Sequence, residues 1–352
     1  MITVQFKLLP TAEQDALLRE TVAEYVSSAN DLLDYCCGQT ERQKLSTASF
    51  NAALPSAVKN EVVNTVKSIL RKHERGACRT LPVLRKPVAT WNNQNYKLAT
   101  AGIMFPIWSG GKSKRIAVKA AIYDYQLERL GGKLGSLRIT LKNDKWVAQV
   151  AVETQAETQP GNGVMGVDLG LKVPAVAVTD AGKTKFCGNG RMNKYVKRNY
   201  RSRRKELGEA KKQKAINQME NKEQRWMRDQ DHKISREIVR FAVSQGVGTI
   251  RMESLKNIRQ TARTSRKNKK NLHTWSFYRL TSFIEYKANM AGIKTEYVNP
   301  AHTSQVCPSC GLLNHAKDRK YLCPCGYSTH RDRVGALNII NAPVVDGHSR
   351  PA

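Results

Sequence analysis

Three acidic residues stand where a carboxylate could hold a metal ion, and two of them lie on predicted strands. In the run VMGVDLG, the two-residue period of a strand puts Gly166, Asp168 and Gly170 on one face. The Asp168 carboxylate would then lie between two positions without side chains, on a face open to a large ligand. Glu253 ends the apolar run VGTIRMES, where a buried unpaired charge would be costly, so it needs a metal ion, a cation or solvent.

The third acid, Asp332, opens a predicted helix in HRDRVGALNII. Each acid also has an ordinary structural explanation: Asp168 as a strand-end turn residue, Glu253 as a solvated strand end, and Asp332 as a first-turn acid favoured by the helix dipole. Together, in a chain of formal charge +30, they predict a site for two divalent cations roughly 4 Å apart on a phosphodiester. Carboxylate oxygens suit Mg²⁺ (or Mn²⁺), which would deprotonate the attacking water and stabilise the leaving oxygen.

Four cysteines form a second constellation. They occur in CPSCG (307–311) and CPCG (323–326), and they are Cys307, Cys310, Cys323 and Cys325. Clustering of this kind predicts a tetrahedral, structural Zn²⁺ site without catalysis. Because the second pair is Cys-x-Cys instead of Cys-x-x-Cys, His315 or His330 could replace one thiolate. The dispersed Cys36, Cys37, Cys78 and Cys187 are interpreted as small buried apolar residues.

The charge balance indicates a polyanionic partner. The chain has 59 Lys and Arg against 29 Asp and Glu, and nucleic acid is the ordinary reason for such an excess. Positive residues concentrate between 194 and 240, interleaved with Tyr195, Tyr200 and Trp226, and in an acid-free loop at 263–271. These cations could neutralise phosphates and the aromatic rings could stack on bases, although solvated helix faces and core packing are the alternatives. No apolar run reaches the roughly 20 residues of a membrane span and no signal peptide is recognisable, so a soluble, cytoplasmic protein is expected.

The first half of the chain must supply a β module. Residues 2–8 alternate like a strand, and Thr11 with Gln14 forms a capping box that opens a helix. A second helix is expected at 56–72. Short strands follow at 115–122, 137–141 and 146–152, the last two joined by a turn at Asn143-Asp144. Residues 11–80 would then be a helical insertion in the β module.

The second half has an α/β pattern that can position the acids. After a linker at 158–163, the pattern predicts, in order, strands at 164–170 and 173–179, a basic helical region at 191–245, a buried strand at 247–252, a basic loop at 257–273, a helix through 277–288, a strand at 293–298 and a last helix from about 332.

These residues resemble the TnpB family, transposon-encoded RNA-guided DNA nucleases related to type V CRISPR effectors. The resemblance covers KLLPTAEQ, GVDLG, the basic helices, RMESLKNI, EYKANMAGIKTEYVNPAHTSQVCPSCG and YLCPCGYSTHRDRVGALNI. It implies a multidomain α+β and α/β protein with an RNase H-like (RuvC-type) nuclease domain, a zinc-ribbon insert, and a β-barrel-like wedge module with a helical insertion. The implied boundaries are 1–10 and 81–156 for the wedge, 11–80 for the recognition lobe, 157–302 and 331–352 for the nuclease, and 303–330 for the ribbon.

The resemblance also implies an activity. Asp168, Glu253 and Asp332 would form the active site of a metal-dependent endodeoxyribonuclease, with a guide RNA and double-stranded target DNA as partners and cleavage beside a short adjacent motif. The short second cysteine turn, the Gly-Ala form of the last motif and the small recognition lobe depart from the usual pattern. The alternatives are an RNA-guided DNA-binding regulator that does not cut, an unguided structure-specific nuclease or resolvase, and a strand-joining transposase, for which no paired-His and Tyr motif is seen.

Overall fold

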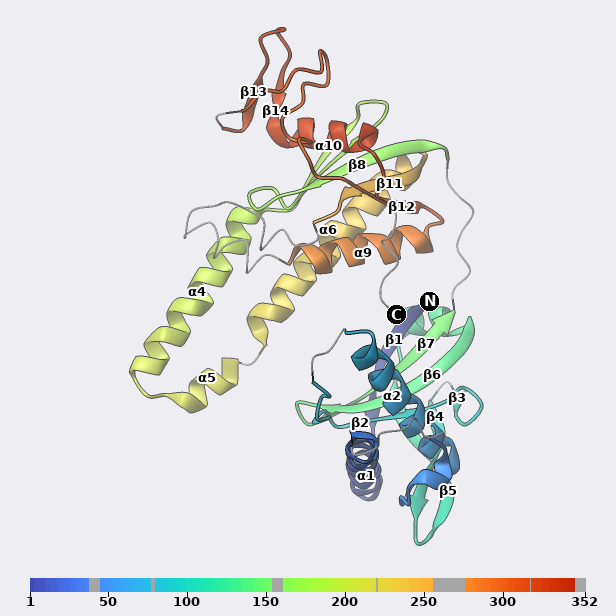
Figure 1. Ribbon diagram of the computed structural model, residues 1–352. Coiled ribbons are helices and arrows are strands. Elements are labelled where there is room, and N and C mark those ends of the chain that lie inside the picture. The colour runs from blue at the N-terminus through green and yellow to red at the C-terminus, as the bar shows by residue number, and fades with distance from the viewer. Residues whose placement is uncertain are drawn as a thin grey trace. The chain divides into compact units, whose positions relative to one another are not determined.

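The computed structural model describes residues 1–37, 45–76, 80–99, 101–153, 161–219, 221–255, 276–316 and 318–345. The chain divides into two compact units, Met1–Gln155 and Ala156–Ala352, and each mixes helices with a sheet (Figure 1). Among the described helices, none combines the length and apolar character needed to cross a bilayer. The predicted loop 257–273, Cys78 and the first part of the predicted linker lie outside the described residues.

Unit 1 is built on a seven-stranded antiparallel sheet with the order β2-β6-β7-β1-β5-β4-β3. Its elements are β1 (Ile2–Leu9), α1 (Ala12–Cys37), the 3₁₀ helix η1 (Thr47–Ser49), α2 (Ser56–Glu74), β2 (Val88–Trp91), β3 (Lys97–Ala99), β4 (Gly102–Ser109), β5 (Lys112–Ala121), α3 (Asp124–Leu130), β6 (Lys133–Lys142) and β7 (Lys145–Glu153). Because β1 lies between β5 and β7, the N-terminal strand joins a sheet whose other strands follow both long helices. Apolar residues of α1 and α2 share one core with the sheet.

Local sequence signals account for several features of unit 1. The capping box at the start of α1 is confirmed, since Thr11 N–H donates to Gln14 Oε1 (3.2 Å) and Gln14 N–H donates to Thr11 Oγ1 (3.3 Å). The Asn143-Asp144 turn between β6 and β7 is also confirmed, with φ of 49° and 53° as a two-residue hairpin loop requires. The strands β2, β3 and β4 and the helix α3 were not resolved as separate elements by the sequence pattern.

Unit 2 has a five-stranded mixed sheet with the order β10-β9-β8-β11-β12. Its elements are β8 (Gly163–Leu169), β9 (Ala175–Thr179), β10 (Thr184–Cys187), α4 (Gly190–Glu209), α5 (Gln213–Met219), α6 (Lys222–Ser244), β11 (Val247–Glu253), α9 (Phe277–Met290), β12 (Lys294–Val298) and α10 (Arg331–Asn341). β8, β11 and β12 run parallel, whereas β9 and β10 are antiparallel to their neighbours. Each strand predicted between 164 and 298 is present, and β10 was missed.

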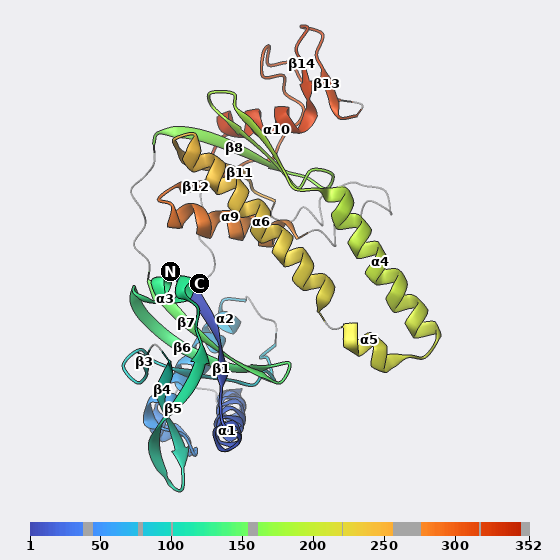
Figure 2. The same cartoon turned by 180° about the vertical axis from the view of Figure 1, so that it is seen from behind.

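Helices cover both faces of this sheet, as Figures 1 and 2 show. Met165, Val167 and Leu169 of β8 belong to a core shared with α6 and α9. On the opposite face, Val176 and Val178 of β9 pack with Ala336 of α10. The alternation of side chains along a strand therefore assigns each residue of the sheet to the α6/α9 face or to the α10 face.

A buried ion pair joins α6 to α9. The Asp231 side chain on α6, 5% exposed, accepts hydrogen bonds from Arg279 (2.7 Å) and Ser276 (3.0 Å) at the start of α9. Burial raises the pKa of Asp231, and the hydrogen bonds from Arg279 and Ser276 oppose that shift. Because both partners satisfy the buried carboxylate, the pair fixes where α9 begins against α6.

Between β12 and α10 the chain forms a small module. It contains a two-stranded antiparallel hairpin of β13 (Lys320–Leu322) and β14 (Ser328–His330) and carries all four clustered cysteines. Tyr321 and Val334 are fully buried with Cys307 and Cys323 in a separate small core. The module is therefore continuous in packing with the first turn of α10.

Candidate active site and cysteine centre

Asp168 and Glu253 lie side by side at the carboxyl ends of two adjacent parallel strands. The pairing of β8 with β11 sets Met252 opposite Val167, so that the next residue of each strand is one of the two acids. The alternation of the strand directs Asp168 away from the α6/α9 core and towards α10. Both predicted strands are present, and their register brings the two acids together at one edge of the sheet.

Asp332 reaches the same region from α10. Gly335, one helical turn after Asp332, lies so close to Asp168 that a Cβ built on it would be 2.8 Å from the Asp168 Oδ2 atom. The pKa of Asp168 is raised well above its usual 3.8, first by burial and then by the negative charges of Glu253 and Asp332. The three predicted acids therefore come together from three elements that are far apart in the sequence.

Glu253 has a partner of its own. Its carboxylate accepts a hydrogen bond from the hydroxyl of Thr303, which is buried beside the cysteine module. Burial raises the pKa of Glu253, and the Thr303 hydrogen bond opposes the shift. Neighbouring buried carboxylates that repel each other are the donor set that divalent cations stabilise, so the residues present fit a hard metal ion.

The expectation that Asp168 faces open space between two glycines is wrong. A Cβ on Gly166 would be 2.0 Å from the backbone oxygen of Ala336, and a Cβ on Gly170 would be 2.7 Å from the backbone oxygen of Val173. The space that a side chain would fill at each glycine is thus occupied by the protein's own backbone. At Gly166 the backbone that fits is α10, which also carries Asp332.

Arg319 is a residue of this region that the sequence patterns did not single out. Its Nη1 atom donates to both carboxylate oxygens of Asp332 at 2.6 Å, and the side chains are 35% and 11% exposed. Arg319 precedes the second cysteine pair, so an element of the cysteine module supplies the counter-charge to an acid on α10. The only available signal was a cation between the two cysteine turns, and many arginines in this basic chain have no such role.

The three carboxylates do not form a closed cage. Within the described parts of the chain, only the four cysteines bring three or more candidate ligand atoms within 4.8 Å of one another. The acids are adjacent, but Asp332 is turned to Arg319. A divalent cation at these acids would therefore take further oxygen ligands, from water or from a phosphodiester, besides the carboxylates.

The cysteine centre has the geometry of a tetrahedral thiolate site. The Sγ atoms of Cys307 and Cys325 are 3.7 Å apart, and those of Cys310 and Cys323 are 3.5 Å apart. Tetrahedral zinc with Zn–S bonds of about 2.3 Å requires sulfur separations of about 3.8 Å. The shorter second turn therefore does not prevent all four sulfurs from meeting.

Backbone donors favour the thiolate form in the first cysteine turn. Burial opposes ionisation of Cys307, but hydrogen bonds from the backbone N–H groups of Cys310 and Ser309 and from the thiols of Cys323 and Cys310 together lower the pKa of Cys307 to about 7. Gly311 and Gly326 close the two turns with φ of 76° and 89°, which only glycine adopts without strain. Each turn is thus shaped to direct its N–H groups at sulfur.

Neither candidate histidine replaces a cysteine. His330 uses Nδ1 to accept the backbone N–H of Asp332 (3.2 Å) and thereby caps α10, while its ring meets Phe186 edge-on at 5.2 Å. His315 is exposed and is not part of the sulfur cluster in the described residues. Among the described residues, the cluster therefore contains the four cysteines and neither histidine.

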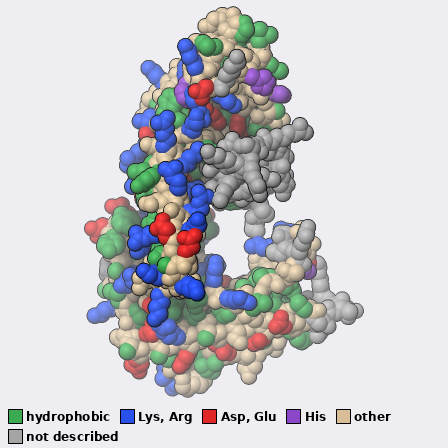
Figure 3. Space-filling view, turned by 90° about the vertical axis from the view of Figure 1, so that its left-hand side faces the viewer, with side chains coloured by type: hydrophobic (Ala, Val, Ile, Leu, Met, Phe, Trp, Pro, Cys, Tyr) green, Lys and Arg blue, Asp and Glu red, His purple; other side chains and the backbone are tan. Residues whose placement is uncertain are grey.

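The basic helical region predicted at 191–245 is present as α4, α5 and α6. Figure 3 looks onto the side that carries α4, where Lys and Arg side chains follow one another down the surface. Tyr195 on α4 is 53% exposed, whereas Tyr200 and Trp226 are half-buried. Stacking of these rings on bases stays a prediction, and Tyr195 is the most accessible of the three.

Two family models match the chain in the regions that hold these residues. A model described as a probable transposase, OrfB_IS605, matches residues 148–259, and the Cas12f1-like TNB domain matches residues 277–339. The first match includes Asp168 and Glu253. The second includes Asp332 and the four cysteines.

Curated relatives resemble parts of the chain. The CRISPR-associated endodeoxyribonuclease Cas12f1 of Sulfoacidibacillus thermotolerans is 30% identical over 218 residues, which are 56% of this chain and 50% of that protein. A TnpB-like protein of Methanocaldococcus jannaschii is 40% identical over 121 residues, 34% of this chain and 43% of that protein. The chain thus spans about half the length, or less, of these two relatives.

Solved structures share the fold. A Cas12f1–sgRNA–target DNA complex contains a chain that superposes with a TM-score of 0.72 at 16% identity, covering 95% of this chain and 83% of that one. At this sequence identity the structural similarity shows the fold alone. The two matched family models and the TnpB-like and Cas12f relatives support a TnpB-type protein over the regions that they match.

Proposed function

We propose that the protein is the RNA-guided DNA endonuclease of a transposable element, with an RNase H-like, RuvC-type core in unit 2. Asp168, Glu253 and Asp332 would hold Mg²⁺ or Mn²⁺, which would bind the scissile phosphodiester for hydrolysis next to a short adjacent motif. The observation that carries the proposal is the meeting of three acids from β8, β11 and α10, where burial first and then the charges of Glu253 and Asp332 raise the pKa of Asp168. The endonuclease names of the Cas12f1 relatives support the same reaction class.

The residues of the site divide the chemistry between them. Two bound divalent cations would activate the attacking water and stabilise the leaving oxygen. Asp168 and Glu253, fixed on adjacent strands, set the spacing of their carboxylates, and Thr303 orients Glu253 by its hydrogen bond. Arg319 holds Asp332 in place and is near enough to the acids to neutralise charge on a phosphate. One such site cuts one strand at a time.

The remaining parts of the chain have supporting roles in this proposal. The β sheet of unit 1 is the wedge and its two long helices are a small recognition lobe. The four cysteines hold a structural Zn²⁺ in a ribbon inserted before α10. The formal charge of +30 supplies phosphate contacts for a guide RNA and a double-stranded DNA target, and the similar Cas12f1 chain was solved in complex with an sgRNA and target DNA.

Cleavage by the purified RNA complex tests the proposal. The full-length protein is produced with the flanking RNA of its element and incubated with matching plasmid and Mg²⁺. Asp168→Ala should abolish product while RNA-dependent DNA binding persists. Asp318→Ala is the matched control, because this acid is 83% exposed in the cysteine module and pairs only at 3.9 Å with Lys172; it should cut like the wild type.

Three outcomes decide against the proposal. Mg²⁺-dependent cutting by Asp168→Ala at the wild-type rate refutes the acid assignment. RNA-dependent binding without product by the wild-type protein, across targets and with Mn²⁺ as well, identifies a DNA-binding regulator. Cleavage that is unchanged by RNase treatment identifies an unguided nuclease.

A further inference from the structure

A basic groove lies on α6, on the side of that helix away from the sheet core. A cavity of about 570 Å³ is lined by Lys185, Lys233, Arg236, Glu237, Arg240, Phe241 and Ser244. All but one of these residues are on α6, spaced so that they share one face of the helix. The buried residues of α6, such as Ile234, Ile238 and Ala242, occupy the opposite face.

The charges of the groove are incompletely balanced. It contains four cations and one carboxylate, and that carboxylate, Glu237, pairs with Lys185 at 3.3 Å. Lys233 pairs with the exposed Asp229 at 2.7 Å. Arg236 and Arg240 are exposed, and within the described residues no carboxylate lies at ion-pair distance from either.

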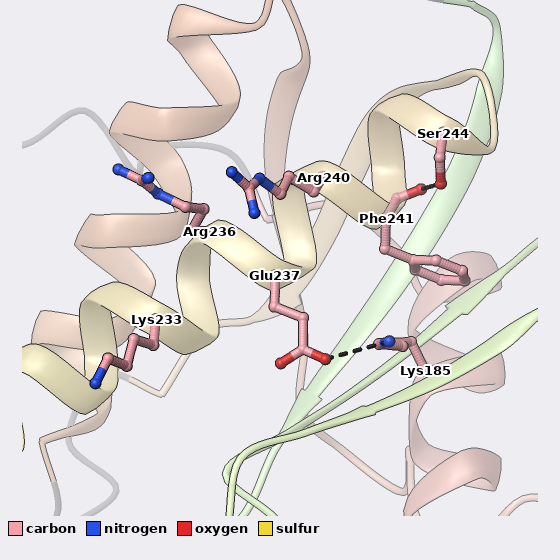
Figure 4. A pocket seen from close by; sticks show the side chains of 7 residues that line it. All are labelled: Lys185, Lys233, Arg236, Glu237, Arg240, Phe241 and Ser244. Atoms are coloured by element: carbon pink, nitrogen blue, oxygen red, sulfur yellow. Dashed lines mark hydrogen bonds and ion pairs between the residues drawn. The ribbon is translucent and has the colours of Figure 1, made fainter. Parts of the chain in front are cut away.

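The two guanidinium groups are placed to act together. Figure 4 shows Arg236 and Arg240 projecting from α6 on the side away from the Glu237–Lys185 pair. They are four residues apart, about 6 Å along the helix axis, and Lys233 extends the row to about 10 Å. Guanidinium groups pair bidentately with phosphate, and a row of this length can meet successive phosphates of one strand.

The groove and the acids are on opposite faces of the sheet. Lys185 and Cys187 of β10 point to α6, and Cys187 is buried in the core shared with α6. Phe186, between them, points the other way and meets His330 next to α10. Asp168 also faces α10, so the sheet and α6 itself separate the groove from the carboxylates.

We infer that this groove is a phosphate-binding site for the RNA partner, separate from the path of the DNA strand that is cut. An RNA that the protein retains while it cuts DNA must keep its phosphodiesters away from the acids. A site on the side of α6 that faces away from the acids meets this requirement. Phe241, half-buried, packs against the core of unit 2 and closes one end of the lining. The inference rests on the proposed function for the presence of an RNA partner.

Salt-dependent RNA binding tests the inference. The probe is the RNA that copurifies with the wild-type full-length protein, and a DNA duplex of matched length serves for comparison. Arg240→Gln should weaken RNA binding severalfold and lower the slope of log affinity against log salt by about 0.7–0.9, with about twice that change for Arg236→Gln/Arg240→Gln. Arg228→Gln is the matched control, an exposed arginine of α6 outside the groove, and should leave the slope unchanged.

The comparison separates the possible results. Loss of RNA affinity with DNA-duplex affinity unchanged supports the inference. Loss of DNA affinity alone would show that the groove binds DNA and not RNA. Equal effects of Arg240→Gln and Arg228→Gln would show that the groove is not a distinct binding site. If the wild-type protein binds its RNA through the groove but never cuts DNA, only the proposed function is refuted. If the wild-type protein purifies without any bound RNA, the proposed function and the inference about the groove are both refuted.

Discussion

Gly166→Ala is the substitution that tests most directly whether α10 and β8 must touch for the acids to work. A Cβ at this position would lie 2.0 Å from the Ala336 backbone oxygen and 3.1 Å from the Ile340 side chain. Ordinary contact begins near 3.4 Å, so α10 must retreat by about 1.4 Å. Since Asp332 moves with α10 and Asp168 stays on β8, the carboxylates separate. A misplacement of about 1 Å costs roughly 100-fold in rate, which is the loss of cleavage that we expect.

The same substitution should cost stability without unfolding the protein. Overpacking of this kind destabilises by about 1–3 kcal/mol. Each kcal/mol shifts the Tm of a unit of this size by about 2–4 °C, so that assays at 25 °C still use folded protein. The RNA-binding groove on the other face of the sheet should be unaffected. Loss of cleavage with retained RNA is therefore the expected signature.

Gly163→Ala is the control on the same strand. Its Cβ would approach the Gly246 backbone oxygen at 3.3 Å and the Asp180 carboxylate at 3.6 Å, contacts that small shifts relieve. We expect near wild-type cleavage and Tm. The measurements are single-turnover cleavage of a labelled target with Mg²⁺ and thermal unfolding of the same preparations. If Gly166→Ala cuts within about threefold of the wild type, far from the roughly 100-fold loss predicted for a 1 Å displacement, the reasoning about α10 is refuted.

Three further predictions concern the neighbours of the acids. Arg319→Lys keeps the charge but replaces the guanidinium whose Nη1 donates to both oxygens of Asp332 with a shorter side chain that ends in an ammonium. Single-turnover kinetics should find the cleavage rate down about tenfold or more with RNA binding retained, and an unchanged rate would show that Arg319 does not position Asp332. Metal analysis should find about one zinc per chain in the wild type; Cys325→Ala should lose it, and well under one zinc in the wild type would count against the centre. In EDTA, the raised pKa of Asp168 means that its stabilising contribution is present below its ordinary value of 3.8 and is lost as pH rises through the higher folded pKa. Asp168→Asn should therefore have a higher Tm than the metal-free wild type at pH 8 while failing to cut, and a lower Tm would contradict the burial of that charge.

Short-range patterns predicted the longer helices and many of the strands of both units because those patterns act locally. Strand alternation placed Asp168 and Glu253 on strand ends, and the capping box located the start of α1, because each depends on residues within a few positions. The meeting of those strands with α10 was anticipated by taking the three acids together, and the resemblance to a known family supported Asp332 most. No local signal relates residue 168 to residue 332.

What the sequence did not reveal depends on packing between distant segments. Gly166 was interpreted as open space for a ligand, and it is the contact point of a helix that begins 165 positions later along the chain. Arg319 was one cation among 59, and only the hairpin fold brings it to Asp332. At the cysteines, by contrast, the spacing of the residues in the sequence was enough to predict a four-sulfur centre.

The cysteine centre has a direct structural connection to the active site. The β13–β14 hairpin carries Cys323 and Cys325 between its strands. Arg319, directly before β13, donates to the carboxylate of Asp332, and His330, the last residue of β14, caps α10 by accepting the Asp332 N–H. Arg333, the next residue, donates to Thr184 Oγ1 at 3.0 Å and so ties the helix start to β10. Asp332 is thus fixed by the hairpin through its side chain and its backbone, and by the sheet through its neighbour. The zinc proposed for the four cysteines would hold the hairpin closed and so fix the position of Asp332, an acid that it does not touch. Removal of that metal should therefore lower cleavage before it unfolds unit 2.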